Sequence, residues 1–584
     1  MRLYGLIAVA VLVSACSAAA PDETAPIAAE REPGDEPLWP RAPNTPAGDL
    51  DPEVGDAVDR LIDSFVAGSF DSGALDVVAA SGDPRLAWLI SDLLRLVPTG
   101  LTEQSLVDAF SALTGVDARA DDQFGPSSWQ AVTNLMIGWD VPEPPAYREM
   151  KAALYLRVEP AWAPFFADED ADIDWRWISW GGVLIDDRPS GDRQACARGC
   201  IPALDDPTLT AAADGGWYAD DRTVFGVVVN DEAVAFPKHI MEVHEMVNLT
   251  IEGRRVGMPY CTLCSSAQAY LTDEVPAGVE TPVLRTTGLL SRSNKVMYDL
   301  VTDSVFNTFT GRALSGALQD AGIVLEQTTV VITTWGEWKA AHPDTRIVAR
   351  DGGIGRAYPD DPLSGRDDDG PIFPIGQVDP RLPAHAQVLG VISPGGESAA
   401  FAVDQAASAL ATGDPVMIGP IEIFDDGGGL RARASDGAEL AAHQAFWFAW
   451  SQFHPDTALW TGLDPRPGVA VSSRPATTPD PRTAFVAAMC PALAELAKLE
   501  AQLDTLRSGD VEGSAALAMV SEARGPIAAV PDWHAGNGLR SAMLESLDLI
   551  SAALRAGAAT EIPYITTDRV EAELQAAMAA GFGC

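Results

Sequence analysis

The sequence is poor in basic residues. Its 39 lysines and arginines stand against 83 aspartates and glutamates, and the formal net charge at pH 7 is −44. A chain with this charge repels the phosphate backbone of DNA and RNA, so we expect no nucleic-acid partner. The acidic residues are spread along the chain, which is typical of a well-solvated protein surface.

Long hydrophobic runs are also lacking, because no apolar stretch after the N-terminal segment is long enough to span a bilayer. The N-terminus has the order of an export signal: Arg2, an apolar run over residues 3–13, and two small residues before Cys16. This order is similar to the bacterial lipobox, in which the cysteine is acylated and the signal is removed. We therefore predict a signal peptide over residues 1–15, a lipid anchor on Cys16 that binds the membrane, and an extracytoplasmic location at the outer membrane or cell surface. An ordinary signal peptide followed by a chance cysteine is the alternative.

Cysteine is scarce as well, with seven in 584 residues. Outside the cytosol, the cysteines that follow Cys16 are expected to be paired or otherwise protected from oxidation. Proximity along the chain favours three pairs, although other connectivities stay open. These pairs are Cys196 with Cys200, Cys261 with Cys264, and Cys490 with Cys584.

The composition divides the chain into five segments. Residues 16–51 are rich in Ala, Pro and Glu and are predicted to form a disordered tether, whereas residues 52–160 repeat apolar residues at helical spacing. Residues 175–462 combine short β-branched and aromatic runs with turn residues, which is typical of strands. A linker over 463–482 precedes a second helical segment, 483–584. We predict an α+β fold: a β-rich central domain made of two related halves, flanked by N-terminal and C-terminal helical domains.

A weak internal repeat is the reason for predicting two halves. The pattern Trp-x-x-Trp-x-x-x-His-Pro-Asp-Thr begins at Trp335 and again at Trp447. Its spacing places the two indoles and the histidine on one stripe of a helix, where such residues are more often core than catalytic. We therefore interpret His342 and His454 as structural. The candidate site described next occurs in the first half alone.

Two motifs of the first half carry the candidate site. His244-Glu245-Met-Val-Asn248 is followed by Tyr-Cys261-Thr-Leu-Cys264-Ser. They resemble the bacterial domain of unknown function 3179 family, whose pattern runs from His-Glu-x-Val-Asn-Asp to Tyr-Cys-Pro-Leu-Cys-Gly. The resemblance covers about residues 175–460 and extends to further motifs. These are Ile201-Pro-Ala-Leu-Asp205, Gly288-Leu-Leu, Met297-Tyr-Asp and the tryptophan-histidine segment.

The chain departs from this family pattern at several positions. Leu249 stands where the family usually has Asp, Thr262 where it has Pro, and Ser265 where it has Gly. The activity of the family is unsettled. The resemblance therefore indicates where the site lies and leaves its reaction open.

The residues of the two motifs suggest three kinds of chemistry. Two cysteines separated by two residues place both sulfur atoms on one side of a turn, where they can bind one soft metal ion or form a disulfide. With the imidazole of His244 as a further ligand, the set suits copper or zinc, and Glu245 would orient a ligand or accept a proton. The cysteines could instead be a redox dithiol or an inert disulfide.

We predict an extracytoplasmic lipoprotein in which Cys261, Cys264 and His244 bind copper or zinc, or in which the thiols carry out redox chemistry. The same three residues and Glu245 are the candidates for any catalytic role, although the sequence leaves open whether the chain is an enzyme. The competing hypothesis is a non-enzymatic surface module whose helical flanks bind a protein partner and whose cysteines are structural. The glycine cluster at 352–355 lacks the spacing of a phosphate-binding loop, so we expect no nucleotide cofactor there.

Overall fold

The computed structural model describes residues 39–121, 124–366, 370–393 and 395–462, together with helix α16 and further residues between 485 and 574. The chain forms two compact units, and the larger comprises Leu38–Pro362 and Gly370–Arg466. Cys16, Cys490, Cys584 and the linker over 463–482 lie outside the described residues.

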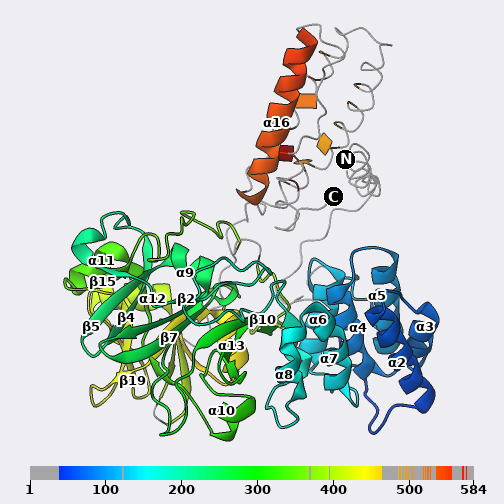
Figure 1. Cartoon of the computed structure of the whole chain (residues 1–584), viewed down its shortest axis with the longest axis horizontal. Coiled ribbons are helices and arrows are strands. Elements are labelled where there is room, and N and C mark those ends of the chain that lie inside the picture. Colours follow the sequence, from blue (N-terminus) through cyan, green and yellow to red (C-terminus); the bar gives the residue numbers. More distant parts are fainter. Residues whose placement is uncertain are drawn as a thin grey trace, which may run out of the picture. The chain divides into compact units, whose positions relative to one another are not determined.

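The N-terminal part of the larger unit is helical (Figure 1). Aspartates begin the first two helices, since the side chains of Asp51 and Asp71 accept hydrogen bonds from the backbone N–H groups of Glu53 and Ala74. The helices are α2 (Pro52–Val66), α3 (Ser72–Ala80), α4 (Ala87–Leu96), α5 (Leu101–Thr114), α6 (Ser128–Trp139), α7 (Tyr147–Val158) and α8 (Ala163–Ala167).

Residues 39–51, which we assigned to the tether, pack against these helices. The Trp39 ring meets Phe124 edge-on at 5.3 Å, and Trp139 Nε1 donates to the carbonyl oxygen of Pro40 at 2.6 Å. Arg85 Nη1 likewise donates to the carbonyl oxygen of Gly48. Aromatic and backbone contacts thus hold this segment to the helices.

The strands of the larger unit form five small sheets in a propeller-like arrangement. The first contains β1 (Ile178–Trp180), β10 (Leu284–Ser291), β11 (Asn294–Asp299) and β12 (Val305–Asn307). The second contains β2 (Leu204–Asp205), β6 (Met246–Ile251), β7 (Arg254–Cys261), β9 (Ala269–Leu271) and β13 (Glu326–Thr328), with β8 (Ser266–Ala267) beside β7.

The other three sheets complete the β structure. The third contains β3 (Leu209–Ala211), β4 (Thr223–Val229), β5 (Glu232–Pro237), β14 (Val331–Thr334) and β15 (Arg346–Val348). The fourth contains β16 (Gln387–Ile392), β17 (Ser398–Ala402), β22 (Ala442–Phe446) and β23 (Ala458–Trp460). The fifth contains β18 (Val416–Ile418), β19 (Ile421–Asp425), β20 (Leu430–Ala434) and β21 (Glu439–Leu440).

Short helices join the strands, and one long helix lies in the smaller unit. Among the described residues the α-helices number 13. Those after α8 are α9 (Lys238–His244), α10 (Gly316–Asp320), α11 (Trp335–Ala341), α12 (Val403–Thr412), α13 (Trp447–Phe453) and, in the smaller unit, α16 (His534–Arg555).

The predicted fold class is wrong. The structure is a propeller-like set of small sheets with many helices, and no central β domain is flanked by separate helical domains in its described part. The core of helices α2–α8 continues into the first sheet, where Leu289, Val296, Tyr298 and Val305 belong to the same apolar cluster as Trp88 and Trp162. Helical periodicity shows that a segment is a helix, but it does not show what the apolar face packs against.

Two of the sheets are built alike. In the third, the order β14-β4-β5-β15 places β15 parallel to β5, and in the fourth, β22-β16-β17-β23 places β23 parallel to β17. The buried rings of Trp338 and Trp450 each cover a glycine of the central strand, Gly226 or Gly390, where a Cβ atom would clash. The two tryptophan segments are therefore part of the core.

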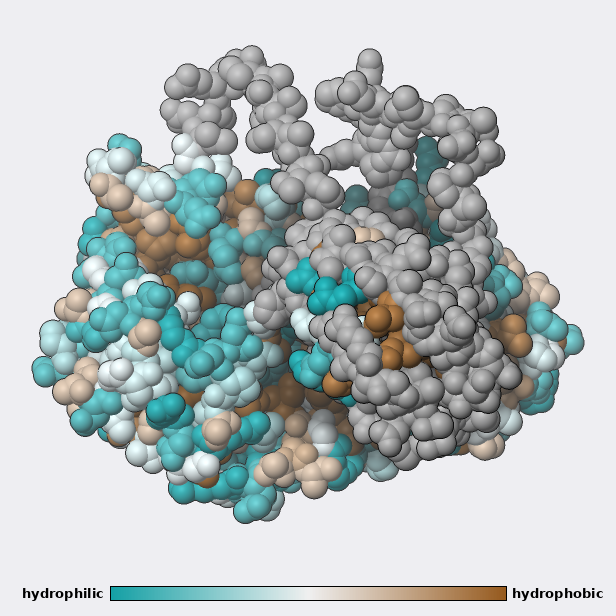
Figure 2. All heavy atoms as spheres, turned by 90° about the horizontal axis from the view of Figure 1, so that it is seen from above, coloured by the Kyte–Doolittle hydropathy of each residue, from teal (hydrophilic) through white to brown (hydrophobic). Residues whose placement is uncertain are grey.

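Figure 2 shows one face of the molecule, on which hydrophilic residues surround small hydrophobic areas. This distribution agrees with the excess of acidic residues over the whole chain. No helix of the described residues is both long and apolar enough to cross a membrane.

Candidate functional site

The cysteines of the Cys-x-x-Cys motif lie at the end of β7. A 3-10 turn, Thr262–Cys264, follows Cys261, and β8 then pairs back with Ser266 opposite Cys261. Ser265 leaves the turn with φ of 47°, a left-handed conformation that suits the glycine usual in the family pattern. The turn places both sulfur-bearing side chains in the interior, where Cys261 is 1% and Cys264 0% exposed.

Both cysteines are thiols that approach one carbonyl group. The Sγ atoms of Cys264 and Cys261 lie 3.4 and 3.8 Å from the carbonyl oxygen of Ser293. The backbone N–H of Lys295 donates to Cys261 Sγ at 3.4 Å. Burial opposes ionisation of Cys261, but the hydrogen bonds from Cys264 and from the Lys295 N–H lower its pKa below the usual value. The pair can therefore supply a thiolate.

A buried ion pair between Glu245 and Lys295 lies beside the dithiol. Lys295 Nζ pairs with Glu245 Oε2, and the two side chains are 6% and 12% exposed. Thr262 Oγ1 donates to Glu245 Oε1 at 2.6 Å. The threonine that replaces the family's proline therefore gives Glu245 a second partner in this chain.

His244 lies in a different environment from the cysteines. Its Nδ1 is 2.7 Å from the carbonyl oxygen of Pro202, and its Nε2 is 2.7 Å from the hydroxyl oxygen of Tyr358. Because a carbonyl can only accept, Nδ1 carries the proton and the Tyr358 hydroxyl donates to Nε2. Both ring nitrogens are thus engaged, and the structure does not bring His244 together with Cys261 and Cys264.

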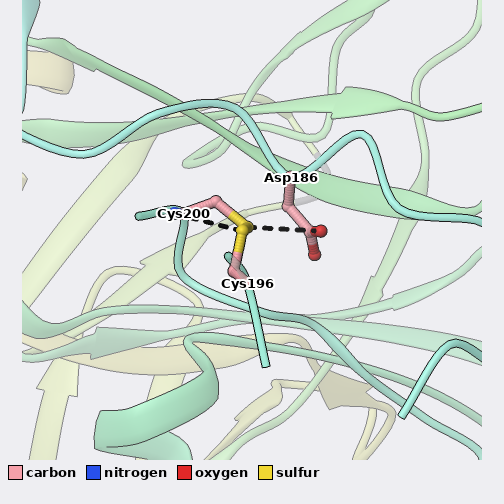
Figure 3. Close-up of side chains that lie close together, drawn as sticks. All are labelled: Asp186, Cys196 and Cys200. Carbon is pink, nitrogen blue, oxygen red and sulfur yellow. Dashed lines mark hydrogen bonds between the residues drawn. A yellow bond between two sulfur atoms is a disulfide. The ribbon is translucent and has the colours of Figure 1, made fainter. Parts of the chain in front are cut away.

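Cys196 and Cys200 form a second cysteine site, next to Asp186 (Figure 3). They are joined by a disulfide with a Cα–Cα distance of 5.5 Å, and Cys200 Sγ lies 3.6 Å from Asp186 Oδ1. Among the described residues, these three form the group whose ligand atoms lie close enough together to hold a metal ion. The site is compatible with metal binding or with a structural disulfide.

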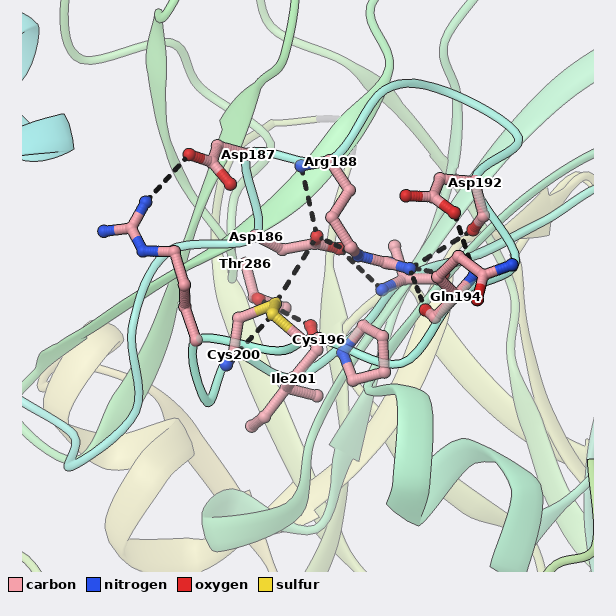
Figure 4. Close-up of a disulfide and its surroundings, with 12 residues drawn as sticks. Asp186, Asp187, Arg188, Asp192, Gln194, Cys196, Cys200, Ile201 and Thr286 are labelled. Atoms are coloured by element: carbon pink, nitrogen blue, oxygen red, sulfur yellow. Dashed lines mark hydrogen bonds and ion pairs between the residues drawn. A yellow bond between two sulfur atoms is a disulfide. The ribbon is translucent and has the colours of Figure 1, made fainter.

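The partners of Asp186 favour a structural disulfide at this second site. Figure 4 shows Arg188 beside Asp186, with its Nε and Nη2 donating to the two carboxylate oxygens at 2.6 and 2.9 Å. The backbone N–H of Ala203 donates to Asp186 Oδ2 at 2.7 Å, and Arg285 Nε lies 3.7 Å from the same oxygen. A carboxylate already neutralised by two guanidinium groups is a poor metal ligand.

Asn248 of the His-Glu motif joins strands and does not enter the dithiol site. Its Nδ2 donates to Asp205 Oδ1 and to the carbonyl oxygen of Leu284, both at 3.0 Å, and its Oδ1 accepts from the Leu284 N–H. Arg285 pairs with both carboxylate oxygens of Asp205, at 2.9 and 2.6 Å. This buried network connects β2, β6 and β10.

Sequence reasoning missed several residues of these sites: Asp186, Arg188, Arg285, Ser293, Lys295 and Tyr358. A signal existed for Lys295, which lies between the motifs Gly288-Leu-Leu and Met297-Tyr-Asp of the family resemblance. The hairpin of β10 and β11 brings it to the cysteines. Tyr358 had no such signal, since it lies in a loop after β15.

The sheets and the buried dithiol define a β-rich domain with a cysteine site in its interior. Residues 198–436 match the family described as Protein of unknown function (DUF3179), the family that the motifs of this region resemble. No curated protein and no solved structure matches the chain.

Proposed function

We propose that this chain is a lipid-anchored protein of the cell envelope whose Cys261 and Cys264 bind copper(I). The observation that carries the proposal is the pair of buried thiols at the end of β7, which approach one carbonyl oxygen, with hydrogen bonds that lower the pKa of Cys261 below its usual value. Two thiolates on one side of a turn are the soft ligands that copper(I) prefers.

The ligand set supports copper(I) over zinc. A structural zinc site has four protein ligands in tetrahedral geometry. In the described part of the chain, the group of three His, Cys, Asp or Glu side chains that could hold a metal ion is Asp186, Cys196 and Cys200. The described residues therefore place no third ligand of these types beside Cys261 and Cys264. Cys261 and Cys264 would thus be the protein's thiolate ligands, and His244 is not among the ligands that we propose.

A charged pair, Glu245 and Lys295, lies next to the dithiol and would act on a bound ion. Copper(I) with two thiolates carries one net negative charge, which is costly to bury without compensation. Lys295 lies beside Cys261 through its backbone N–H, and its ammonium group is held by Glu245. The opposite charges of this pair largely offset each other, and the Glu245 carboxylate, which acts on Cys261 more strongly than the Lys295 ammonium group, would attract the copper ion itself.

Burial supports metal binding over thiol exchange with a partner protein. Exchange requires a thiolate to reach a sulfur atom of the partner in line with its disulfide bond. Cys261 and Cys264 are nearly inaccessible to solvent, at 1% and 0% exposed. A small ion can enter through a brief local opening, whereas a partner's disulfide needs a larger one.

Copper binding can be tested on the full-length chain in detergent. We expect anaerobic titration against a chromogenic copper(I) chelator to show a single tightly bound ion per chain, and Cys261→Ser or Cys264→Ser to abolish it. The double variant Cys196→Ser and Cys200→Ser is the matched control and should keep the ion. Lack of tight uptake by the reduced wild-type chain would contradict the proposal, and so would uptake that survives Cys261→Ser.

The lipid anchor is tested separately. We expect cells supplied with a labelled fatty acid to incorporate the label into the wild-type chain, and Cys16→Ala to lose the label and leave the membrane fraction. A labelled Cys16→Ala chain would contradict the anchor and leave the copper site unaffected.

A further inference from the structure

A pocket of about 350 Å³ has His244 in its wall. Besides His244, three segments line it, of which the third is far from the first two in the sequence. They are residues 188–195 before the Cys196–Cys200 disulfide, residues 202–205 around β2, and residues 354–356 in the loop after β15. The pocket is thus built by tertiary contacts in the larger unit.

Arg188 holds the rim of this pocket in place and has no donor left for a ligand. Besides Asp186, its guanidinium donates to the carbonyl oxygens of Asp192, Gln194 and Ala203, at 3.2, 2.9 and 3.1 Å (Figure 4). All five of its N–H groups are therefore used within the protein. Together with the disulfide, Arg188 fixes the segment that carries Arg193.

Two other arginines of the pocket supply positive charge and form no ion pair among the described residues. Arg193 is exposed and donates from Nη1 to the carbonyl oxygen of Gly353 at 3.1 Å. Within the described residues, the guanidinium of Arg356 has no ion-pair partner, and it lies 5.7 Å from the centre of the Tyr358 ring. Of the two acidic residues of the wall, Asp205 is paired with Arg285, and Asp192 accepts a hydrogen bond from the Gln194 N–H and offsets part of the positive charge.

His244 forms a neutral part of the wall. Its Nδ1–H donates to Pro202, and its Nε2 accepts from Tyr358. Burial first, and then the positive charges of Arg356 and Arg188, lower the pKa of His244 to about 4. The imidazole therefore adds no positive charge at neutral pH, and the attraction for an anion comes from the arginines.

We propose that this pocket binds a small oxyanion, a carboxylate or a phosphate, through the guanidinium groups of Arg193 and Arg356. A guanidinium group presents paired N–H donors that match the two oxygen atoms of such a group. The volume of the pocket suits a small metabolite and is too small for a folded partner. This site is separate from the proposed copper site and does not depend on it.

The test uses the full-length chain in detergent, with inorganic phosphate and succinate as the probes. We expect isothermal titration at constant ionic strength to show saturable binding of at least one probe. Arg356→Gln and Arg193→Gln should each weaken this binding about tenfold, the loss expected for one charge-assisted pair. Arg60→Gln, which removes the same charge from the exposed surface of α2, is the matched control and should leave affinity unchanged.

The outcomes distinguish a phosphate site from a carboxylate site, and they also show whether the proposal fails. Binding of phosphate alone or succinate alone supports the site and names the class, and binding of both supports a general oxyanion site. Lack of saturable binding of either probe overturns the proposal, as does an equal loss in Arg60→Gln. The melting temperature of each variant shows whether it is folded, and a folded Arg356→Gln with wild-type affinity also overturns the proposal.

Discussion

His244 and Glu245 are consecutive residues whose side chains lie in two different sites. Glu245 ends α9 with φ of 52°, a left-handed conformation that turns the chain into β6. As a result His244 contacts Pro202 and Tyr358 beside the arginine pocket, whereas Glu245 contacts Thr262 and Lys295 beside the dithiol. One short motif thus contributes to both proposed sites.

Replacing Glu245 by Gln should destabilise the protein strongly. The change leaves the ammonium group of Lys295 buried without its counter-charge, and breaking a buried ion pair from one side costs about 3 kcal/mol. Chemical denaturation of the two proteins measures the difference. Glu422→Gln, in an exposed pair with Arg433, is the control and should have no measurable effect. Equal stability of Glu245→Gln and wild type would show that the ion pair does not contribute.

The stability of the protein should fall in mild acid because of His443. Burial, and to a lesser extent the charge of His454, lowers the pKa of His443 to about 3. The unfolded chain takes up this proton near the ordinary pKa of about 6.5, so stability is fully present above that pH and is lost as the pH falls towards 3.

Denaturation at two pH values measures this effect. Between pH 7 and pH 5, wild type should lose about 2 kcal/mol more than His443→Gln, which cannot be protonated. Gln keeps a side-chain acceptor for the Gln327 amide, which lies 2.8 Å from His443 Nδ1. The same pH dependence in both proteins would contradict the assignment to His443.

Gly226→Ala and Gly390→Ala should destabilise the protein by similar amounts. At either position the new methyl group would overlap the indole ring of Trp338 or Trp450, and overpacking of this kind costs about 2 kcal/mol. Gly216→Ala, where a Cβ atom meets no neighbour within 4 Å, is the matched control. If neither core substitution changed the melting temperature, this would show that α11 and α13, which carry the two tryptophans, can move aside.

Removing the disulfide with Cys196→Ser and Cys200→Ser should lower stability by about 2 kcal/mol, the chain-entropy value for a short loop. The same double variant should also bind the oxyanion more weakly, because the segment that carries Arg193 loses one of its attachments. Denaturation and titration measure the two effects. Arg188 continues to hold the rim, so we expect affinity to be reduced and not abolished. Wild-type stability in the double variant would show that the disulfide is dispensable.

The sequence predicted some features of the fold well because they depend on local spacing. Apolar residues at helical spacing marked the N-terminal helices, and the repeated tryptophans marked α11 and α13. The fold class predicted from the sequence was wrong, because the helices share a core with the first sheet through residues such as Leu289 and Tyr298. Contacts between residues that are far apart in the sequence leave no periodic signal.

For the candidate site, the sequence proposed Cys261, Cys264 and Glu245, which lie close together in the structure, and missed their neighbour Lys295. It also placed His244 with the cysteines because the motifs are close in the chain. Glu245 leaves α9 in a left-handed conformation with φ of 52°, and the side chains of the two neighbouring residues enter different sites. Spacing alone does not reveal such an angle in a residue other than glycine.

By itself, then, the sequence determined the family resemblance of residues 198–436 and the cysteine turn, which follow from residue types at short spacing, and the acidic character, which follows from composition. The tertiary structure alone decided that His244 faces an arginine-lined pocket and that Lys295 accompanies the dithiol. Both depend on strands and loops from distant parts of the chain meeting in a packed core. Burial and long-range hydrogen bonding decide which distant segments pack together, and local propensity does not determine this packing.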